Sequence, residues 1–534
     1  MEKKNKWFAG MICAALAASL LAGCAASNGS KDTAQNGGGT DAGEGSPAKP
    51  KLAFWSLNPD QTKVDSPGVT AIKDKFGIDV EFMPISSDSY KEKVNLMLAS
   101  GQIPDWWKEP TLPDYEKFIQ QGVAAAIPQE LIEKNMPNYM KWIKRFLGDD
   151  PFKYVKRDGK IYGLPTVWDI GIDGMQLGFR EDWLKKVGID RIPETLLEME
   201  EALTKFRNND PDGNGKKDTY GMTATGDSLG LFSSVFGAYD VYPGIFREKD
   251  GKIVRGEIEP GAKQALEVLN RWYKNELIDP EFVVNKSNNF EDKMLTGKAG
   301  AAEYYWWSFI PGAAFLGGKT WDDQIKEADP NAGWVTEGGV KGPDGKYGMQ
   351  QSSPYSGTGL MFGKQMEKEP EKLEKYLQVF EASQFDAEIY KKLNFGIEGT
   401  HYNMSDKGTV EFIAPYNDEK ERKKLGINGG YSMSGSFNDY DFQTSFTSDE
   451  KLRPLAKSTR AKSVKVFDIL SSYQKPVFNE YADRLNQYTL QNYIDFITGR
   501  KPLSEFDSFV EGWKKNGGDK VLEEAQKVYD ENNR

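Results

Sequence analysis

The chain has 534 residues, of which 38% are hydrophobic, 12% aromatic and 28% charged. This length predicts two or three domains, and the composition excludes a mostly disordered chain. A mean hydropathy of −0.62 excludes a multi-span membrane protein. The formal net charge is −11 and the basic residues form no stripe, so we expect no nucleic-acid partner. His401 is the only histidine, which excludes sites that need several.

The first residues have the pattern of an export signal. A lysine-rich start over 3–6 precedes an apolar run over 7–21, and small residues follow before Cys24. A charged start, a short apolar stretch and small residues before a cleavage site are typical of a secretory signal. The sequence therefore predicts a signal peptide over 1–23.

The motif Leu21-Ala22-Gly23-Cys24 resembles the lipobox of bacterial lipoproteins. The resemblance implies cleavage before Cys24 and attachment of diacylglycerol, with acyl chains such as palmitate, to the Cys24 thiol. Two or more chains give stable membrane anchoring. An ordinary signal peptide with an incidental cysteine is the alternative. Residues 24–50 hold no bulky apolar side chain, so we expect a lipidated flexible tether.

The body opens with alternating strand and helix patterns. Strands are predicted over 51–56 and 78–82, and helices over 67–75 and 90–98. This order is typical of an α/β sheet with its ligand site at the strand ends. Further helices are predicted over 137–146, 181–187, 195–208, 260–275, 369–384, 458–471, 481–498, 504–515 and 518–532.

Residues 210–218 match the first nine positions of an EF-hand-type calcium loop. Calcium prefers six to eight oxygen ligands, and a glycine at the sixth position permits the sharp turn. The predicted ligands of a structural Ca²⁺ ion are the side chains of Asp210, Asp212, Asn214 and Asp218 and the carbonyl of Lys216. The twelfth position is Gly221 instead of the usual glutamate, so another ligand or water must complete the shell. An ordinary polar turn is the alternative.

Aromatic residues are numerous, with 13 Trp, 24 Tyr and 29 Phe. A sugar ring has an apolar face and a rim of hydroxyls, so its site needs aromatic platforms beside carboxylates or amides. Several aromatics stand beside such polar residues in predicted loops, although core packing is the alternative for each of them. The candidate ligand-binding residues are Trp55, Asn58, Asp105, Trp106, Trp168, Asp169, Tyr304, Trp306 and Trp307.

Catalytic motifs are weak or absent in the sequence. The 80 acidic residues make carboxylate pairs inevitable, so the pair that a glycosidase needs carries little weight. There is no Gly-x-Ser-x-Gly motif and no dinucleotide fingerprint. The glycine turn over 317–320 lacks the opening glycine of a phosphate loop, because that position is Ala313. We therefore predict no catalytic residues.

Several blocks along the chain resemble the extracellular solute-binding lipoproteins of bacterial ABC importers, in their large oligosaccharide-type branch (family 1). The most specific blocks are Tyr162-Gly163-Leu164-Pro165 and Arg180-Glu181-Asp182-Trp183-Leu184. The lipobox, the calcium-type loop and further blocks at 54–56, 103–105, 192–195, 277–281 and 394–402 extend the resemblance over nearly the whole chain.

The resemblance implies an α/β, periplasmic-binding-protein-like fold with two lobes, a hinge and an interlobe cleft that holds the ligand. Carried onto this chain, the first lobe takes 51–165 and returns over 300–360. The second lobe takes 166–299 and returns over 361–534, ending in the C-terminal helices.

The function implied is capture of an oligosaccharide and its delivery to the permease subunits of an ABC transporter. We expect a non-enzymatic monomer, lipid-anchored at the extracellular face of the bacterial cell membrane. A sensor or adhesin that binds a peptide or polymer is the alternative, and a glycoside-cleaving enzyme is a third. An aromatic, cation-poor pocket would favour a neutral sugar, whereas Arg180, Lys298 or Lys364 could bind an acidic one.

Overall fold

The computed structural model describes residues 49–108, 110–312, 319–355, 357–427, 433, 437 and 439–532. Buried side chains in these ranges form two large hydrophobic clusters. The first cluster draws on 52–172 and 355–437, and the second on 177–349 and 470–525. We call the parts of the chain around them the first lobe and the second lobe. The signal peptide, Cys24 and nearly all of the tether lie outside the described residues.

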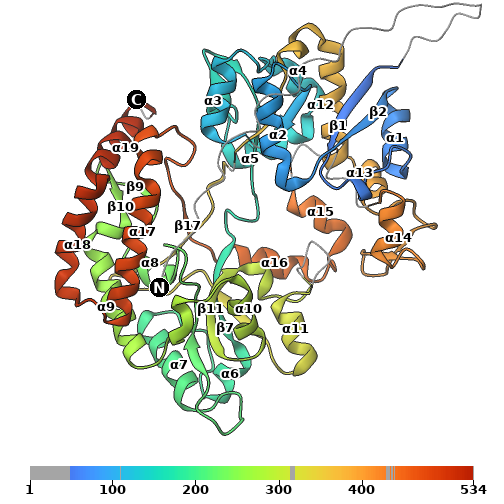
Figure 1. The fold of residues 1–534 in the computed structure, drawn as a ribbon. Coiled ribbons are helices and arrows are strands. Elements are labelled where there is room, and N and C mark those ends of the chain that lie inside the picture. Colours follow the sequence, from blue (N-terminus) through green and yellow to red (C-terminus); the bar gives the residue numbers. More distant parts are fainter. Residues whose placement is uncertain are drawn as a thin grey trace, which may run out of the picture. The chain divides into compact units, whose positions relative to one another are not determined.

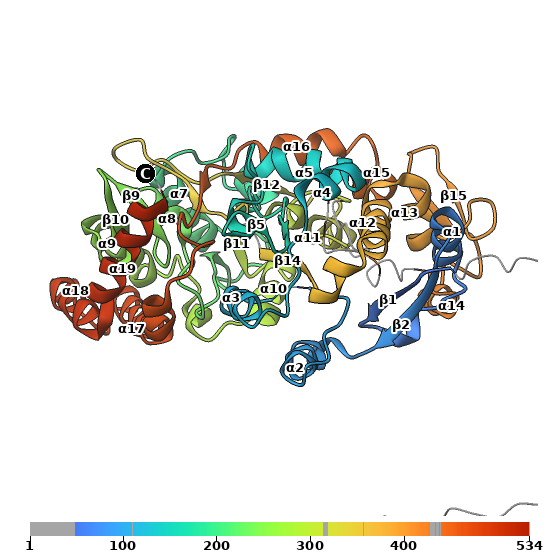
Figure 2. The same cartoon turned by 90° about the horizontal axis from the view of Figure 1, so that it is seen from above.

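The first lobe begins with the predicted strand–helix–strand unit. Strands β1 and β2 pair in parallel, and α1 connects them (Figures 1 and 2). Helix α1 starts where the Ser66 side chain accepts the Val69 N–H at 3.3 Å, and it ends at Gly77, whose φ of 63° suits glycine. The local sequence thus sets both helix ends.

A second sheet of the first lobe has the order β3-β14-β6, in which β14 comes from a distant part of the chain. The strands of the lobe are β1 Lys51–Ser56, β2 Asp79–Pro84, β3 Trp106–Lys108, β4 Lys156–Arg157, β5 Lys160–Ile161, β6 Leu164–Thr166, β14 Gly357–Phe362, β15 Tyr402–Met404 and β16 Val410–Phe412. Its helices are α1 Pro67–Phe76, α2 Ser87–Ala99, α3 Leu112–Gln120, α4 Gln129–Asn135, α5 Pro137–Leu147, α12 Pro370–Phe385, α13 Ala387–Asn394 and α14 Glu419–Lys424.

The second lobe is built on a sheet of order β12-β7-β11-β8, in which β11 is antiparallel to β7 and parallel to β8. Its strands are β7 Met175–Arg180, β8 Tyr220–Met222, β9 Phe246–Lys249, β10 Lys252–Arg255, β11 Ala299–Tyr305, β12 Trp334–Glu337 and β13 Met349–Gln350. Its helices are α6 Glu181–Lys186, α7 Leu196–Asn208, α8 Ser233–Gly237, α9 Pro260–Lys274, α10 Ser287–Leu295, α11 Trp321–Ala328, α17 Pro476–Thr498, α18 Phe506–Trp513 and α19 Asp519–Asn532.

Close packing fixes the helices of this lobe on its sheet. A Cβ on Gly300 of β11 would lie 2.4 Å from the Phe206 ring of α7, so only glycine permits this approach. A capping box between Thr195 and Glu198 starts α7. Figure 1 shows α17 and α19 beside α9 and the β9–β10 hairpin. Across the described ranges, no helix combines the length and apolar character needed to cross a membrane.

The chain passes between the two clusters three times. The first crossing is 167–174, the second is 351–354, and the third contains α15 Tyr440–Thr447, α16 Arg453–Arg460 and β17 Lys465–Val466. Parallel pairing of β13 with β17 brings the second and third crossings together. The Ser352 N–H donates to the Gly171 carbonyl at 3.0 Å, which joins the second to the first.

The two returning segments pack differently from the predicted lobe assignment. Strand β11 pairs with β7 and β8 in the sheet of the second lobe, and Ala301, Val340 and Met349 belong to the second cluster. Helix α12 packs into the first cluster, and only the last part of the chain, from about 470, returns to the second. Small buried residues in β11 suit a central strand of the second sheet, and this pairing could not be read from the local sequence.

The helix predicted over 458–471 is wrong. Helix α16 ends at Arg460, and the chain then forms β17. Tertiary contacts override the helical spacing here, because the Ser463 hydroxyl donates to the Asp173 carbonyl at 3.0 Å and β17 pairs with β13. The other predicted helices are present within a few residues of their expected ends.

Candidate functional site

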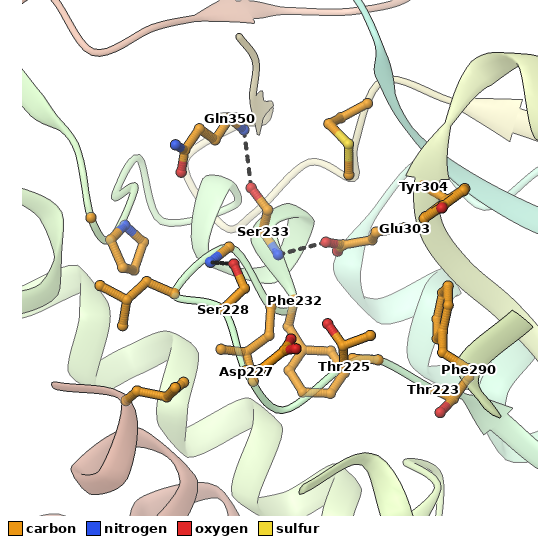
Figure 3. Close-up of a pocket in the computed structure, with 18 of the residues that line it drawn as sticks. Thr223, Thr225, Asp227, Ser228, Phe232, Ser233, Phe290, Glu303, Tyr304 and Gln350 are labelled. Carbon is orange, nitrogen blue, oxygen red and sulfur yellow. Dashed lines mark hydrogen bonds between the residues drawn. The ribbon is translucent and has the colours of Figure 1, made fainter. Parts of the chain in front are cut away.

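A cavity of about 750 Å³ lies in the second lobe. Its wall combines the loop after β8, the start of α8, the end of β11, the second crossing and one face of α17. The residues that line it are Met175, Met222, Thr223, Ala224, Thr225, Asp227, Ser228, Leu229, Gly230, Leu231, Phe232, Ser233, Pro243, Gly244, Phe290, Glu303, Tyr304, Tyr305, Gln350, Gln351, Ser352, Asn486, Gln487 and Leu490. Figure 3 shows ten of these side chains labelled. We call this cavity the β11 pocket.

The Glu303 carboxylate is held in place within the wall of the β11 pocket. It accepts the Ser233 N–H at 2.6 Å and the Ser234 N–H at 2.8 Å, and the Ser234 hydroxyl also donates to it. Figure 3 shows its side chain pointing to Ser233, with Tyr304 and Phe290 on the same side. Burial raises the pKa of Glu303 to about 7, and the bonds from Ser234 and Ser233 oppose that rise. The carboxylate is therefore a preorganised acceptor.

Some other polar groups of the pocket form hydrogen bonds within the protein, and others do not. The Ser233 hydroxyl accepts the Gln350 N–H at 3.0 Å, and the Thr223 hydroxyl donates to Asp279 at 2.8 Å. Within the described part of the chain, the Gln350 amide and the Thr225 hydroxyl have no protein hydrogen-bond partner. Both line the cavity, so they are available to a bound ligand.

Four aromatic residues contribute to the wall of the pocket, namely Phe232, Phe290, Tyr304 and Tyr305. The Tyr304 ring stacks on Trp321 with centroids 4.6 Å apart. The Tyr305 ring stacks on Trp307 at 4.4 Å with an interplanar angle of 5°. Each tyrosine thus has a rigid support behind it, as a platform for a sugar ring requires.

Among the predicted ligand-binding residues, Tyr304 lines the pocket and Trp168 and Trp307 lie close to it. Trp168 is half-buried on the first crossing, and its ring meets the Tyr305 ring edge-on at 5.5 Å. The structure thus brings residues from the first crossing and from the end of β11 into one aromatic group.

Trp55, Trp106 and Trp306 are packed in the interior, with at most 2% of each side chain exposed. The Trp55 indole donates to the Trp106 carbonyl at 2.9 Å, and the Trp106 indole donates to the Ala53 carbonyl at 2.9 Å. For Trp55 and Trp106 core packing is the right explanation, because their rings and their N–H groups are used within the first lobe. Trp306 lies in a small cluster with Tyr440.

The predicted polar partners are also apart from the β11 pocket. Asn58 is exposed at the start of a short 3-10 turn. Asp105 accepts the Tyr376 hydroxyl at 2.8 Å and pairs with Lys372 at 2.8 Å. Asp169 is buried and accepts the Tyr440 N–H at 2.9 Å, and burial raises its pKa to about 7. Asp105 and Asp169 therefore brace backbone and helices instead of facing the pocket.

The calcium-type loop forms a compact oxygen-rich turn. Asp210 accepts the Asn214 N–H at 3.1 Å and the Gly215 N–H at 2.9 Å, while the Asn214 amide donates to Asp212 at 2.7 Å and to Asp218 at 3.1 Å. Burial and the neighbouring Asp210 raise the pKa of Asp212. Lys298 pairs with Asp218 at 2.7 Å. Within the described residues, no group of three or more His, Cys, Asp or Glu has the spacing of a metal site.

The hard oxygens of this loop nevertheless suit Ca²⁺ by their chemistry. Turning the Asn214 amide over would present its oxygen where its nitrogen now stands, at a point between two carboxylates. The Asn214 amide thus joins the Asp212 and Asp218 carboxylates, and the Lys298 ammonium pairs with Asp218, where a bound Ca²⁺ would have to replace it.

Sequence reasoning missed the loop 223–233, Phe290 and the Gln350–Gln351 pair. The loop is rich in glycine and serine and carries no chemical motif, so a single sequence gives no signal for it. Gln350 and Gln351 become part of the wall only because β13 returns to the second lobe.

A family model described as "Bacterial extracellular solute-binding protein" matches residues 69–379, more than half of the chain. The chain therefore belongs to this family. Its members bind solutes and are not enzymes, as the sequence predicted. The predicted two-lobe α/β fold is likewise confirmed.

Two curated relatives span the whole chain. Lipoprotein LipO of Bacillus subtilis is 27% identical over 550 residues, which cover 99% of each protein. The polygalacturonan/rhamnogalacturonan-binding protein YtcQ of the same species is 24% identical over 534 residues, covering 98% of this chain and 99% of YtcQ.

Solved structures share the fold at low sequence identity. A solute-binding protein of Bifidobacterium longum infantis that is described as "HMO binding" has a TM-score of 0.66 at 14% identity, covering 90% of this chain and 99% of that one. FusA of Streptococcus pneumoniae, solved with kestose, has a TM-score of 0.61 at 19% identity, covering 91% and 99%. An EF-hand mutant of FusA has also been solved.

Proposed function

We propose that the chain is a lipid-anchored receptor that captures an oligosaccharide and delivers it to the permease of an ABC importer. The observation that carries this proposal is the β11 pocket. Supported aromatic rings at Tyr304 and Tyr305 face polar groups that include the fixed Glu303 carboxylate. This combination suits a ring with an apolar face and a hydroxyl rim.

The relatives support an oligosaccharide ligand. FusA is named for fructooligosaccharides and YtcQ for polygalacturonan and rhamnogalacturonan, so related chains are described as binding both neutral and acidic saccharides. Transfer of the ligand class to this chain rests on the pocket as well as on these names.

The segments that cross between the two lobes would couple ligand binding to the conformation of the protein. A ligand shifts a conformational equilibrium only by its difference in affinity for the two states. Gln350, Gln351 and Ser352 line the pocket and lead into the second crossing. A ligand that touches them therefore acts directly on the segment that joins the lobes, and the permease would recognise the resulting conformation.

A Ca²⁺ ion in the loop 210–218 is part of this proposal. Asp210, Asp212, Asn214 and Asp218 would bind it through side-chain oxygens, and Lys216 through its carbonyl. The ion would stabilise the connection between α7 and β8. The EF-hand of FusA supports the idea that relatives carry such a loop.

Anchoring through Cys24 at the extracellular face of the cell membrane completes the proposal, and the receptor would act as a monomer. The family is extracellular, and LipO is named a lipoprotein. Mass spectrometry of the protein from native membranes tests the anchor, because the N-terminal peptide should begin at Cys24 and carry acyl chains. An unmodified N-terminus further along the tether would contradict it.

A thermal-shift screen of residues 25–534 against oligosaccharides tests the binding function. A ligand that binds the native state raises the melting temperature by mass action. We expect a shift with one class of oligosaccharide and recovery of that sugar uncleaved. A shift only with peptides or long polymers would favour a sensor or adhesin, and cleavage of the sugar would contradict the receptor.

A further inference from the structure

We infer that the β11 pocket selects uncharged oligosaccharides and rejects those that carry uronate or sulfate groups. The inference rests on the proposed oligosaccharide-binding function and names the ligand class of that same site. It follows from the charges of the wall and from the way the donors of the wall are already used.

The wall carries negative charge only. Among the described residues that line the pocket there is no Lys, Arg or His, whereas Asp227 and Glu303 are carboxylates. Asp227 is exposed on the loop after β8, and within the described chain it forms no ion pair. A carboxylate or sulfate on a sugar would meet two acidic side chains and no cation, which is unfavourable in a partly desolvated cavity.

Three backbone N–H groups at the pocket are already occupied within the protein. The Ser233 and Ser234 N–H groups both donate to Glu303. The Met175 N–H donates to the Gln351 side chain at 2.8 Å. Glu303 thus takes the place that a ligand carboxylate would need, and it offers ligand hydroxyls an acceptor instead.

The three basic residues that the sequence analysis named as possible partners of an acidic ligand form ion pairs with other residues of the protein. Arg180 makes two hydrogen bonds to Asp182, at 2.9 and 2.8 Å. Lys298 pairs with Asp218 at 2.7 Å in the calcium-type loop, and Lys364 pairs with Glu367 at 2.7 Å in the first lobe. None of the three lines the β11 pocket.

A further cation stands near the pocket on α17. Arg484 lies three residues before Gln487, which lines the cavity, so the two share one helix face. The Arg484 guanidinium, however, lies over the Tyr481 ring at 4.7 Å. It is therefore engaged outside the wall.

Matched pairs of oligosaccharides test the inference. Tetramers of mannose and mannuronate, of galactose and galacturonate, and of glucose and glucuronate, each pair with one linkage, differ only at C6. Calorimetric titration of residues 25–534 at pH 7.5 and low salt should show a neutral tetramer binding at least about tenfold more tightly than its acidic partner. Equal or tighter binding of the acidic partner would overturn the inference and leave the proposed function standing. Binding by neither class of any pair would count against both.

Two charge-reversal variants locate the effect. Asp227→Lys places a cation on the exposed lip of the pocket, and Asp344→Lys makes the same change of net charge on an exposed loop outside it. We expect Asp227→Lys to tighten binding of the acidic tetramer by roughly threefold or more, with no such gain for Asp344→Lys. Equal gains in both variants would show a general charge effect and contradict selection by the pocket.

Discussion

The side-chain amide of Gln351 pairs with the backbone of Met175 as a second strand would. Its oxygen accepts the Met175 N–H at 2.8 Å, and its nitrogen donates to the Met175 carbonyl at 3.1 Å. The Gln351 N–H also donates to the Val466 carbonyl at 2.8 Å. One buried glutamine therefore ties together the segments through which the chain passes between the lobes.

Replacement of Gln351 by leucine should destabilise this junction. The Met175 N–H and carbonyl would lose their partners, which costs about 1–3 kcal/mol when such groups stay buried. The measurement is the free energy of unfolding in urea, with hydrogen exchange of the Met175 amide as a local readout. Gln350→Leu is the matched control, because its side chain has no protein partner in the described chain and faces the pocket. Equal stabilities of the two variants would contradict the role of Gln351.

Substitution of a core tryptophan should lower stability, whereas substitution of a tryptophan beside the pocket should weaken oligosaccharide binding. Trp106→Phe replaces a buried indole by a smaller phenyl ring and removes its hydrogen bond to the Ala53 carbonyl, so it should lower the free energy of unfolding by about 1–3 kcal/mol. Trp307→Phe should cost less, because Trp307 is half-buried, but it should weaken oligosaccharide binding through the loss of support for Tyr305. Urea unfolding and calorimetry measure the two effects. A loss of affinity only in Trp106→Phe would contradict this assignment.

Calcium should stabilise the second lobe. Saturation at about 100 times the dissociation constant contributes about 2.7 kcal/mol, so a chelator should lower the melting temperature by several degrees. Asp212→Asn should abolish this response, and Asp227→Asn should retain it because Asp227 lies in the pocket loop. A wild-type melting temperature that is the same with calcium and with chelator would rule out the ion.

Glu303 should make stability depend on pH. Its pKa is raised from 4.5 to about 7, so the folded state holds the proton more tightly than the unfolded state. Its contribution to stability is therefore fully present below pH 4.5 and is lost as pH rises through 7, with a size on the order of 1–3 kcal/mol. Asp169 acts in the same direction, so the comparison is between variants. The free energy of unfolding of Glu303→Gln should therefore fall less than that of the wild type as pH rises through 7, whereas Asp227→Asn should show the wild-type fall.

Local sequence signals predicted the elements better than the site. Ser66, Pro67 and Gly77 mark the ends of α1 by their own chemistry, and the capping pair Thr195–Glu198 does the same for α7. Such signals lie within a few residues of the structure they determine. The family resemblance then supplied the two-lobe arrangement, which the local pattern alone does not contain.

The site depends on pairings between distant segments. Trp55 and Trp106 looked like ligand platforms because each stands beside polar residues, yet each donates its indole N–H to the other's strand in the first lobe. Gln350 joins the pocket because β13 returns to the second lobe, and Glu303 faces it because β11 pairs with β7. No local pattern encodes these relationships.

The central claim is that the β11 pocket binds the oligosaccharide. It is tested most directly by calorimetric ligand titration of two variants, each with one threonine replaced. Thr225→Trp fills part of the pocket, and Thr204→Trp adds the same ring on the exposed face of α7. Both variants should first be shown to melt cooperatively. With the best ligand of the thermal-shift screen, Thr225→Trp should bind at least about tenfold more weakly than wild type, a loss of about 1.4 kcal/mol, while Thr204→Trp binds normally. Wild-type affinity in a folded Thr225→Trp variant would contradict the claim.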